Sequence, residues 1–362
     1  MLYRALGLMS GSSLDGLDLA FIEFQVEATQ WQYRIEAAAC YPYPTAWRQR
    51  LLGATTLPAR DYLQLHADYG HYLGEQVNRF IEEKELAYRV GFIASHGHTT
   101  FHHPESRLTA QLGDGAALAA STRLPVISDL RSMDVAFGGQ GAPIVPLGEQ
   151  LLFPNYSYFL NLGGIANISL APAPYLAFDV CPANRVLNAL AEQMGHSMDE
   201  GGSIARTGHV QRALLAALNA LDYYQRTGPK SLPNQFGTEV VLPMLLQAGH
   251  SIPDLLATYC EHIAVQVQQS FSNTHRPIAP GDMLVTGGGA FNDYLIERIA
   301  SALQTFGIKP IVPEPELVQY KEALIMALIG VLRWRQENTV MASVTGASVP
   351  SVGGAFWMGQ EA

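Results

Sequence analysis

The chain has 362 residues, more than a single hydrophobic core usually fills, so we expect two domains. Hydrophobic residues make up 48% of the sequence and charged residues 15%, which is typical of a globular protein with a large core. The formal net charge of −10, without a cluster of Lys or Arg, argues against a nucleic-acid-binding surface but leaves nucleotide binding open.

Three cysteines, Cys40, Cys181 and Cys260, are far apart and lack CxxC spacing. Their number and spacing favour a reducing compartment and argue against a structural zinc site. The N-terminal apolar run is interrupted too early for a signal peptide, and no apolar run is long enough to span a bilayer. We therefore expect a cytoplasmic protein.

The first predicted element is a β-hairpin whose turn is dense in Gly and Ser, between two apolar runs. Glycines permit backbone angles that other residues avoid, so the amides and hydroxyls of this turn can point toward a phosphate. Two carboxylates lie close enough to meet a metal ion on that anion. The residues of this cradle are Ser10, Gly11, Ser12, Ser13, Asp15, Gly16 and Asp18. The alternative is a tight hairpin whose polar residues face water.

Strands and helices then alternate, as in an α/β protein. A helix is predicted over 61–83 from the helical spacing of Leu63, Leu65, Tyr69, Leu73, Val77 and Phe80. A strand over 89–95 leads into Ser95-His-Gly-His98 and is followed by a helix over 115–121 and a strand over 125–128. Residues 129–146 are too rich in Gly for a regular element, so we expect a linker or a binding loop.

The opening pattern recurs near the middle of the chain. Two apolar runs enclose Gly163-Gly164, which predicts a second hairpin. A further strand over 175–179 precedes Asn184, which can cap a helix that places Leu187, Leu190 and Met194 on one face.

Near the C-terminal end, a predicted strand over 283–286 leads into Gly287-Gly-Gly289 and a helix. A helix over 322–334 and a Gly-rich surface turn over 350–358 complete the series. Three Gly-rich loops in this order suggest two related domains that grip a triphosphate, with the third loop against adenosine. The sequence contains no GxxxxGK[ST], no GxGxxG after a strand and no protein-kinase HRD or DFG set.

The segment 7–16, GLMSGSSLDG, resembles the signature of the anhydro-N-acetylmuramic acid kinases of the sugar kinase/Hsp70/actin superfamily. The resemblance spans nearly the whole chain in order, through the segments 95–98, 111–113, 129–146, 161–167, 178–179, 285–292 and 346–347. It implies an α/β actin-like ATPase fold of two ribonuclease H-like domains with a nucleotide cleft between them. We expect residues 1–128 plus 346–362 to form the first domain and residues 129–345 the second.

The resemblance also implies an ATP- and Mg²⁺-dependent enzyme of cell-wall recycling, usually a homodimer. A water attacks the anomeric carbon of 1,6-anhydro-N-acetylmuramic acid, and the released O6 takes the γ-phosphoryl group to give N-acetylmuramic acid 6-phosphate. Asp179 matches the family's catalytic Asp and is expected to be the general base, with Glu322 polarising the water. The alternatives are a helix-capping Asp179 and a Glu322 that only favours the helix dipole.

The same resemblance assigns nucleotide contacts to the Gly-rich loops, and sugar contacts to residues that follow the strand over 89–95 and to the segment 129–146. The expected nucleotide-binding residues are Ser10, Gly11, Ser12, Ser13, Asp15, Gly16, Asn161, Gly163, Gly164, Asn167, Gly287, Gly288, Gly289 and Ala290. The expected sugar-binding residues are His96, Thr99, Arg131 and Asp134. The planar guanidinium of Arg131 suits the lactyl carboxylate, whereas a surface Arg and a structural salt bridge of Asp134 are the alternatives.

The sequence departs from the family pattern at several positions. Two usual glycines after Asp179 are Cys181 and Ala183 here, so the turn is rebuilt or strained if either position needs positive φ. His98 stands where the family has Gln, and the residues after Lys230-Ser231 differ from the usual Thr-Gly-Arg-Glu. We still expect ATP chemistry, but a related anhydro-sugar remains a possible substrate.

Four histidines, His96, His98, His102 and His103, are close together and include an i, i+2 pair suited to zinc. No Cys or carboxylate triad completes a metal set nearby, so we expect no resident metal site. Besides the sugar kinase, two functions remain open. One is a non-catalytic ATP-binding sensor or assembly protein of the same superfamily, which the altered turn favours, and the other is a metal-dependent hydrolase built on the histidines.

Overall fold

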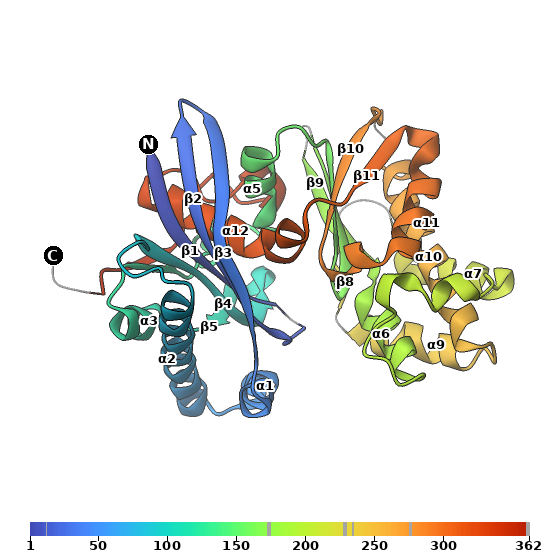
Figure 1. Cartoon of the computed structure of the whole chain (residues 1–362), viewed down its shortest axis with the longest axis horizontal. Coiled ribbons are helices and arrows are strands. Elements are labelled where there is room, and N and C mark those ends of the chain that lie inside the picture. Colours follow the sequence, from blue (N-terminus) through green and yellow to red (C-terminus); the bar gives the residue numbers. More distant parts are fainter. Residues whose placement is uncertain (12, 172–174, 227–229, 234, 275–276, 360–362) are drawn as a thin grey trace. The chain divides into compact units, whose positions relative to one another are not determined.

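The computed structural model describes the whole chain except residues 12, 172–174, 227–229, 234, 275–276 and 360–362 (Figure 1). Packing divides the chain into two compact units. Unit 1 comprises Met1–Pro154 and Tyr320–Ala362, and unit 2 comprises Asn155–Gln319. The described part of the chain contains no helix that is both long and apolar enough to cross a membrane.

Unit 1 is built on a mixed sheet with the strand order β12-β6-β4-β1-β2-β3, in which β5 pairs with β4. The strands β1, β2 and β3 are antiparallel neighbours, whereas β4 is parallel to β1 and to β6. The strands are β1 (Leu2–Ser10), β2 (Gly16–Glu27), β3 (Gln30–Pro42), β4 (Phe92–His103), β5 (Leu108–Leu112), β6 (Val126–Ser128) and β12 (Ala355–Trp357).

Unit 2 repeats this arrangement in the order β11-β10-β7-β8-β9. Its strands are β7 (Tyr158–Leu162), β8 (Ile165–Leu170), β9 (Leu176–Pro182), β10 (Gly281–Thr286) and β11 (Ile308–Ile311). The first three strands are again antiparallel, and β10 is parallel to β7 and β11. Two units with one shared strand order are what a pair of ribonuclease H-like domains requires, so the predicted two-domain actin-like fold is confirmed.

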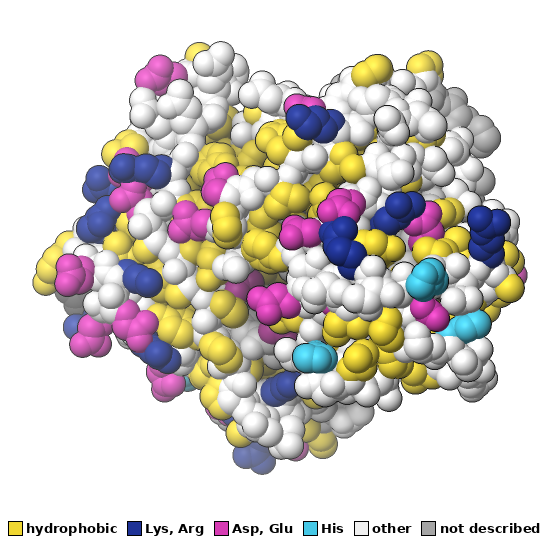
Figure 2. Space-filling view, turned by 45° about the vertical axis from the view of Figure 1, so that its right-hand side comes forward, with side chains coloured by type: hydrophobic (Ala, Val, Ile, Leu, Met, Phe, Trp, Pro, Cys, Tyr) yellow, Lys and Arg dark blue, Asp and Glu magenta, His cyan; other side chains and the backbone are white. Residues whose placement is uncertain are grey.

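The helices cover these sheets. They are α1 (Thr45–Leu52), α2 (Ala59–Glu83), α3 (Gly115–Thr122), α4 (Ser132–Ala136), α5 (Val145–Leu152), α6 (Asn184–Glu192), α7 (Arg212–Asn219), α8 (Asp222–Gln225), α9 (Leu242–Leu246), α10 (Ile252–Ser272), α11 (Asp293–Leu303), α12 (Pro315–Trp334) and α13 (Ala342–Thr345). The face of the molecule in Figure 2 has basic side chains dispersed among acidic ones rather than gathered in one patch.

Four local predictions need correction. Leu63 points to solvent from α2 with 64% of its surface exposed, and Met194 lies beyond the end of α6. Residues 129–146 contain α4 and the start of α5, because the glycines are confined to positions 138, 139 and 141, between the two helices. Residues 350–358 contain β12, which adds to the edge of the unit 1 sheet beside β6.

Unit 1 is held together by a close contact between α12 and β1. Successive residues of a strand point to opposite faces, so Leu6 and Leu8 pack in a core with α2 while Gly7 faces α12. A Cβ at Gly7 would overlap the carbonyl oxygen of Ala323, and one at Gly330 would lie 2.6 Å from Ala94 Cβ. Main chain therefore meets main chain at this interface.

This packing changes the domain limits that we expected. Helix α5 also lies on α12, since a Cβ at Gly148 would be 2.6 Å from Ile325 Cγ1. Residues 129–154 and 320–345, which we expected in the second domain, thus belong to unit 1. Glu149 and Lys321 join the same two helices by an ion pair of 2.9 Å, with 3% of each side chain exposed.

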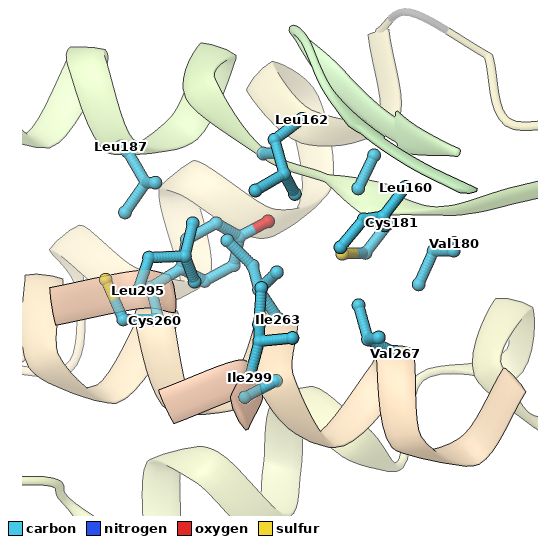
Figure 3. Close-up of a cluster of buried hydrophobic side chains, with 14 of the residues drawn as sticks. Leu160, Leu162, Val180, Cys181, Leu187, Cys260, Ile263, Val267, Leu295 and Ile299 are labelled. Atoms are coloured by element: carbon cyan, nitrogen blue, oxygen red, sulfur yellow. The ribbon is translucent and has the colours of Figure 1, made fainter. Parts of the chain in front are cut away.

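The core of unit 2 includes the turn that departs from the family pattern. Cys181 lies among Leu160, Val180 and Ile263 (Figure 3) and is fully buried, as is Ala183. Neither residue has a positive φ, and Ala183 has φ −128°. The turn therefore needs no glycine at these positions, and burial raises the pKa of the Cys181 thiol, which keeps it protonated.

We expect Lys321→Met to lower the free energy of unfolding by about 3–5 kcal/mol, because it leaves the Glu149 carboxylate buried without its counter-charge. The double variant Lys321→Met/Glu149→Leu removes both charges and is expected to lose much less. Urea denaturation of the three proteins measures this, and an equal loss in the single and double variants would contradict the assigned role of the pair.

Cys181→Gly, which restores the usual family residue, is expected to destabilise the protein by about 2 kcal/mol. The variant loses buried side-chain volume and gains backbone freedom in the unfolded chain, with no strained φ to relieve. Thermal denaturation beside the wild type measures the change. A gain in stability would mean that the turn is strained after all.

Candidate functional site

Ser10, the last residue of β1, lies in a buried row of hydrogen bonds. Tyr43 OH donates to Ser10 Oγ at 2.8 Å, and Ser10 Oγ lies 3.0 Å from His98 Nδ1. Burial lowers the pKa of His98 to about 4, so the imidazole is neutral at neutral pH. Tyr69 OH completes the row, 2.5 Å from Tyr43 OH. The Ser10 hydroxyl is therefore already hydrogen-bonded within the protein.

The turn itself differs from the prediction at its glycines. We expected Gly11 and Gly16 to supply unusual backbone angles, but Leu14 has the positive φ, +58°, and its side chain is buried in the core. Gly16 is needed for space, because a Cβ there would lie 2.7 Å from Cys40 Sγ. Ser13 and Asp15 are exposed on this turn, whereas Ser12 lies outside the described residues.

Two acidic side chains of unit 1 have raised pKa values. Burial raises the pKa of Asp18 to about 6, although a hydrogen bond from the Cys40 thiol lowers it in part. The charges of Glu322 and Asp15 add to the rise. Burial also raises the pKa of Glu322, and Lys321 and Arg131 oppose that shift. A pKa of about 6 lets Asp18 exchange a proton close to neutral pH.

Arg131 is aimed by its neighbours. Its Nε donates to His96 Nε2 at 2.8 Å and its Nη1 donates to the carbonyl of Gly141 at 2.7 Å. His96 Nδ1 lies 2.9 Å from Gly97 O, and burial beside Arg131 lowers the pKa of His96 to about 3, so His96 is neutral. Burial lowers the pKa of Arg131 only to about 10, which keeps it charged at neutral pH. His96 thus orients the guanidinium.

Asp134 has a structural role within unit 1. It is buried and accepts hydrogen bonds from Gly141 N and from Thr345 Oγ1, both at 2.7 Å. For Asp134 we considered a sugar contact and a structural salt bridge. These contacts fit a structural role in which Asp134 fixes the Gly-rich segment through hydrogen bonds. Thr99 is exposed on β4, opposite Gln111 of β5.

The clustered histidines bind separate partners. His96 and His98 contact Arg131 and Ser10, as described above, while His102 and His103 contact Thr109 and Glu105. Across the described ranges, no group of three or more His, Cys, Asp or Glu side chains could hold a metal ion.

In unit 2, predicted residues of the last two Gly-rich loops come together. The parallel strands β7 and β10 end side by side, and ligands of open α/β sheets bind at such carboxyl ends. Gly287 has φ +81°, and a Cβ there would lie 2.5 Å from Asn161 Oδ1. Asn167 pairs with Asn161 from the neighbouring β8. Gly288 begins a short helical turn in which Ala290 is buried.

Helix α6 packs into the same loops. Asn184 N donates to Gly163 O at 3.0 Å and Asn184 Nδ2 donates to Leu162 O at 2.9 Å, while Ala183 N donates to Gly164 O. A Cβ at Gly289 would lie 2.8 Å from Asn184 Oδ1. The N-cap of α6 is Ala183, so the predicted capping role of Asn184 is wrong. Its amide instead joins the helix to the hairpin, which sequence spacing did not reveal.

Asp179 lies in β9 at a β-bulge. It pairs with Asn167, whereas Cys181 pairs with the adjacent Ala166, so Val180 is the extra residue. Bulges of this kind redirect side chains and are frequent at active sites. Leu232 N donates to Asp179 Oδ2 at 2.9 Å, which opposes the rise in the Asp179 pKa that burial causes.

Further contacts of Asp179 come from α8 and the segment after it. Asp179 N donates to Lys230 O at 3.0 Å, and Tyr223 OH donates to Asp179 O at 2.7 Å. Sequence reasoning missed Tyr223 and Leu232, because neither stands in a motif. The carboxylate caps no helix among the contacts described. The strand that we expected to end at Asp179 continues to Pro182, so this half-buried side chain lies within β9, at the bulge.

The family model for anhydro-N-acetylmuramic acid kinase matches residues 3–359. The anhydro-N-acetylmuramic acid kinase of Vibrio vulnificus is 33% identical over 356 residues, which cover 95% of each chain. The protein of the same name from Salinibacter ruber is 35% identical over 369 residues, which cover 94% of this chain and 93% of its own.

Among solved structures, the activator of the 2-hydroxyisocaproyl-CoA dehydratase from Clostridium difficile with bound ADPNP covers 90% of this chain and 93% of its own. Its TM-score of 0.48 and identity of 16% carry no conclusion about activity. The assignment depends on the family model and on the two full-length relatives above 30% identity. This chain belongs to the anhydro-N-acetylmuramic acid kinase family.

Proposed function

We propose that this chain uses ATP to open 1,6-anhydro-N-acetylmuramic acid and to phosphorylate O6, giving N-acetylmuramic acid 6-phosphate, with Asp179 as the general base. Family membership supports a sugar kinase of cell-wall sugar recycling. The observation that carries the mechanism is the Asp179 carboxylate, half-buried at a bulge and oriented through one oxygen by Leu232 N. Following the same resemblance, we propose a cytoplasmic homodimer.

The reaction needs one proton acceptor and one phosphoryl acceptor. Asp179 takes a proton from the water as the water oxygen bonds to the anomeric carbon. The bond from that carbon to O6 breaks, and its electron pair remains on O6. O6 then attacks the γ-phosphorus, and ADP leaves with the electrons of the cleaved bond. Burial raises the pKa of Asp179 and so increases its basicity for this step.

Arg131 is the proposed ligand of the lactyl carboxylate. Its contacts to His96 and Gly141 use Nε and Nη1, which leaves Nη2 to face a ligand. A guanidinium already oriented in this way loses little side-chain entropy on binding. We propose that Thr99 and Glu322 line the same part of the sugar site, with Glu322 polarising the water. His96 then acts through Arg131.

We propose that the amides of the Gly-rich loops bind the nucleotide, with Mg²⁺ on its phosphates. In kinases Mg²⁺ is held by one or two carboxylates together with phosphate oxygens and waters, so three protein ligands are not required. Asp18 and the exposed Asp15 offer oxygen ligands beside the first turn. Burial is the main cause of the raised Asp18 pKa, and the charges of Glu322 and Asp15 add to it; a bound cation would offset these charges. When bound, the ion neutralises the developing phosphate charge.

The argument for a non-catalytic ATP-binding sensor or assembly protein no longer holds. It depended on a need for positive φ at Cys181 or Ala183, and neither residue has a positive φ in the buried turn. A related anhydro-sugar remains an outcome that the substrate comparison below distinguishes.

Asp179→Asn is expected to lower kcat by at least about a hundredfold, since general-base catalysis contributes about 10² to 10⁴ in rate. The amide keeps the size of the side chain, so ATP binding measured by calorimetry is expected to stay near the wild-type value. Turnover close to wild type in this variant would exclude Asp179 as the base.

Release of ADP from Mg·ATP is to be compared for 1,6-anhydro-N-acetylmuramic acid, its N-acetylglucosamine counterpart and unbridged N-acetylmuramic acid. We expect release only with the anhydro-muramic sugar, because Arg131 pairs with the lactyl carboxylate and the unbridged sugar has no bridge to open. Release with the glucosamine counterpart would mean a retuned specificity, and ATP binding without any release would mean a sensor.

A further inference from the structure

We propose that Tyr223 and residues 230–232 form a clasp that holds the Asp179 carboxylate in place for proton abstraction, with Tyr223 as a positioning residue. The proposal rests on the assignment of Asp179 as the general base. Every contact that carries it lies within unit 2, between β9, helix α8 and the segment that follows α8.

Three hydrogen bonds close a ring around Asp179. Asp179 N donates to Lys230 O at 3.0 Å, Lys230 Nζ donates to Tyr223 O at 3.1 Å, and Tyr223 OH donates to Asp179 O at 2.7 Å. Each residue thereby contacts both others. Because the ring includes both the amide and the carbonyl of Asp179, it fixes the peptide planes from which the side chain projects.

A fourth hydrogen bond acts on the carboxylate itself. Leu232 N donates to Asp179 Oδ2 at 2.9 Å, and no hydrogen bond from the described residues reaches Oδ1. One oxygen is thus anchored and the other is left to receive a proton. A hydrogen bond from a neutral amide orients the base and lowers its basicity less than a direct ion pair would.

Lys230 holds the segment without pairing with the base. Its ammonium donates to the carbonyls of Tyr223 and Arg226 and lies 4.5 Å from the centre of the Tyr223 ring. Among the salt bridges of the described residues, none joins Lys230 to Asp179. A cation directly on Asp179 would stabilise the carboxylate and weaken it as a proton acceptor.

The clasp also explains why this segment tolerates departure from the family sequence. Its contacts to Asp179 use the carbonyl of Lys230 and the amide of Leu232, which are main-chain atoms. Any residue at position 232 except proline supplies the same donor. Tyr223, by contrast, contributes through its hydroxyl, so its side chain is required.

The first test compares Leu232→Pro, which deletes the N–H donor, with Leu232→Val, which shortens the side chain equally and keeps the donor. Loss of a hydrogen bond to the charged form raises the pKa of a carboxyl, so the acid limb of the kcat profile is expected to move up by about one pH unit in the proline variant only. An unmoved limb in a folded proline variant overturns the clasp.

The second test compares Tyr223→Phe with Tyr224→Phe. The Tyr224 hydroxyl is buried without a hydrogen-bond partner among the described residues, so its removal is expected to leave kcat unchanged. Tyr223→Phe is expected to lower kcat about tenfold with the KM for ATP unchanged. Equal kcat values for both variants overturn the assigned role of Tyr223, even if Leu232→Pro does not fold.

A readout independent of activity separates this inference from the proposed function. The ¹³C resonance of the Asp179 carboxyl, assigned by its absence in Asp179→Asn, reports its pKa directly. A higher Asp179 pKa in Leu232→Pro, together with full turnover in Asp179→Asn, would support the clasp and refute the assignment of Asp179 as the general base. An unchanged Asp179 pKa in Leu232→Pro, together with loss of turnover in Asp179→Asn, would refute the clasp and leave the proposed function intact.

Discussion

The main-chain contact between α12 and β1 is the constraint on which unit 1 depends. A side chain at Gly7 would overlap the carbonyl oxygen of Ala323, so the helix can approach the strand only where a hydrogen replaces a Cβ. Because the helix lies so close to the strand, Lys321 forms a buried ion pair with Glu149. The charge of Glu322 also adds to the rise in the Asp18 pKa that burial causes, and it opposes the fall in the Arg131 pKa that burial causes. The chemistry of unit 1 therefore follows from a packing distance.

The sequence predicts those features whose signals are local. The two Gly-rich hairpins and the late Gly-rich loop stand in short patterns, and each follows the end of a strand in the structure. The Asp179 carboxylate also stands in such a pattern, but the strand predicted to end there continues to Pro182, so Asp179 lies within β9. The residues around Asp179 could not be found in this way. Tyr223 and Leu232 are 44 and 53 positions away from it in the sequence, and the periodicity of the chain does not encode such pairings.

Some residues have a chemical type that fits two roles, and only their tertiary contacts show which role they have. Asp134 stands four residues before Gly138 and His96 directly before Gly97, and near such glycines a ligand and a residue that braces a loop have the same sequence signal. The structure gives each of them a protein partner, Gly141 and Arg131 respectively. The turn after β1 is a similar case, since the left-handed residue is Leu14, whose burial offsets a conformation that glycine would adopt more readily.

The interrupted course of unit 1 has a consequence for the order in which the protein is made. Residues 155–319 are contiguous, so unit 2 can assemble as soon as they leave the ribosome. Unit 1 needs α12 and β12 from the last part of the chain, and until they emerge the face of β1 at Gly7 and the edge of β6 stay uncovered. A nascent chain stalled near residue 319 would therefore carry one finished unit and one open sheet, which is the form most exposed to aggregation and to chaperones.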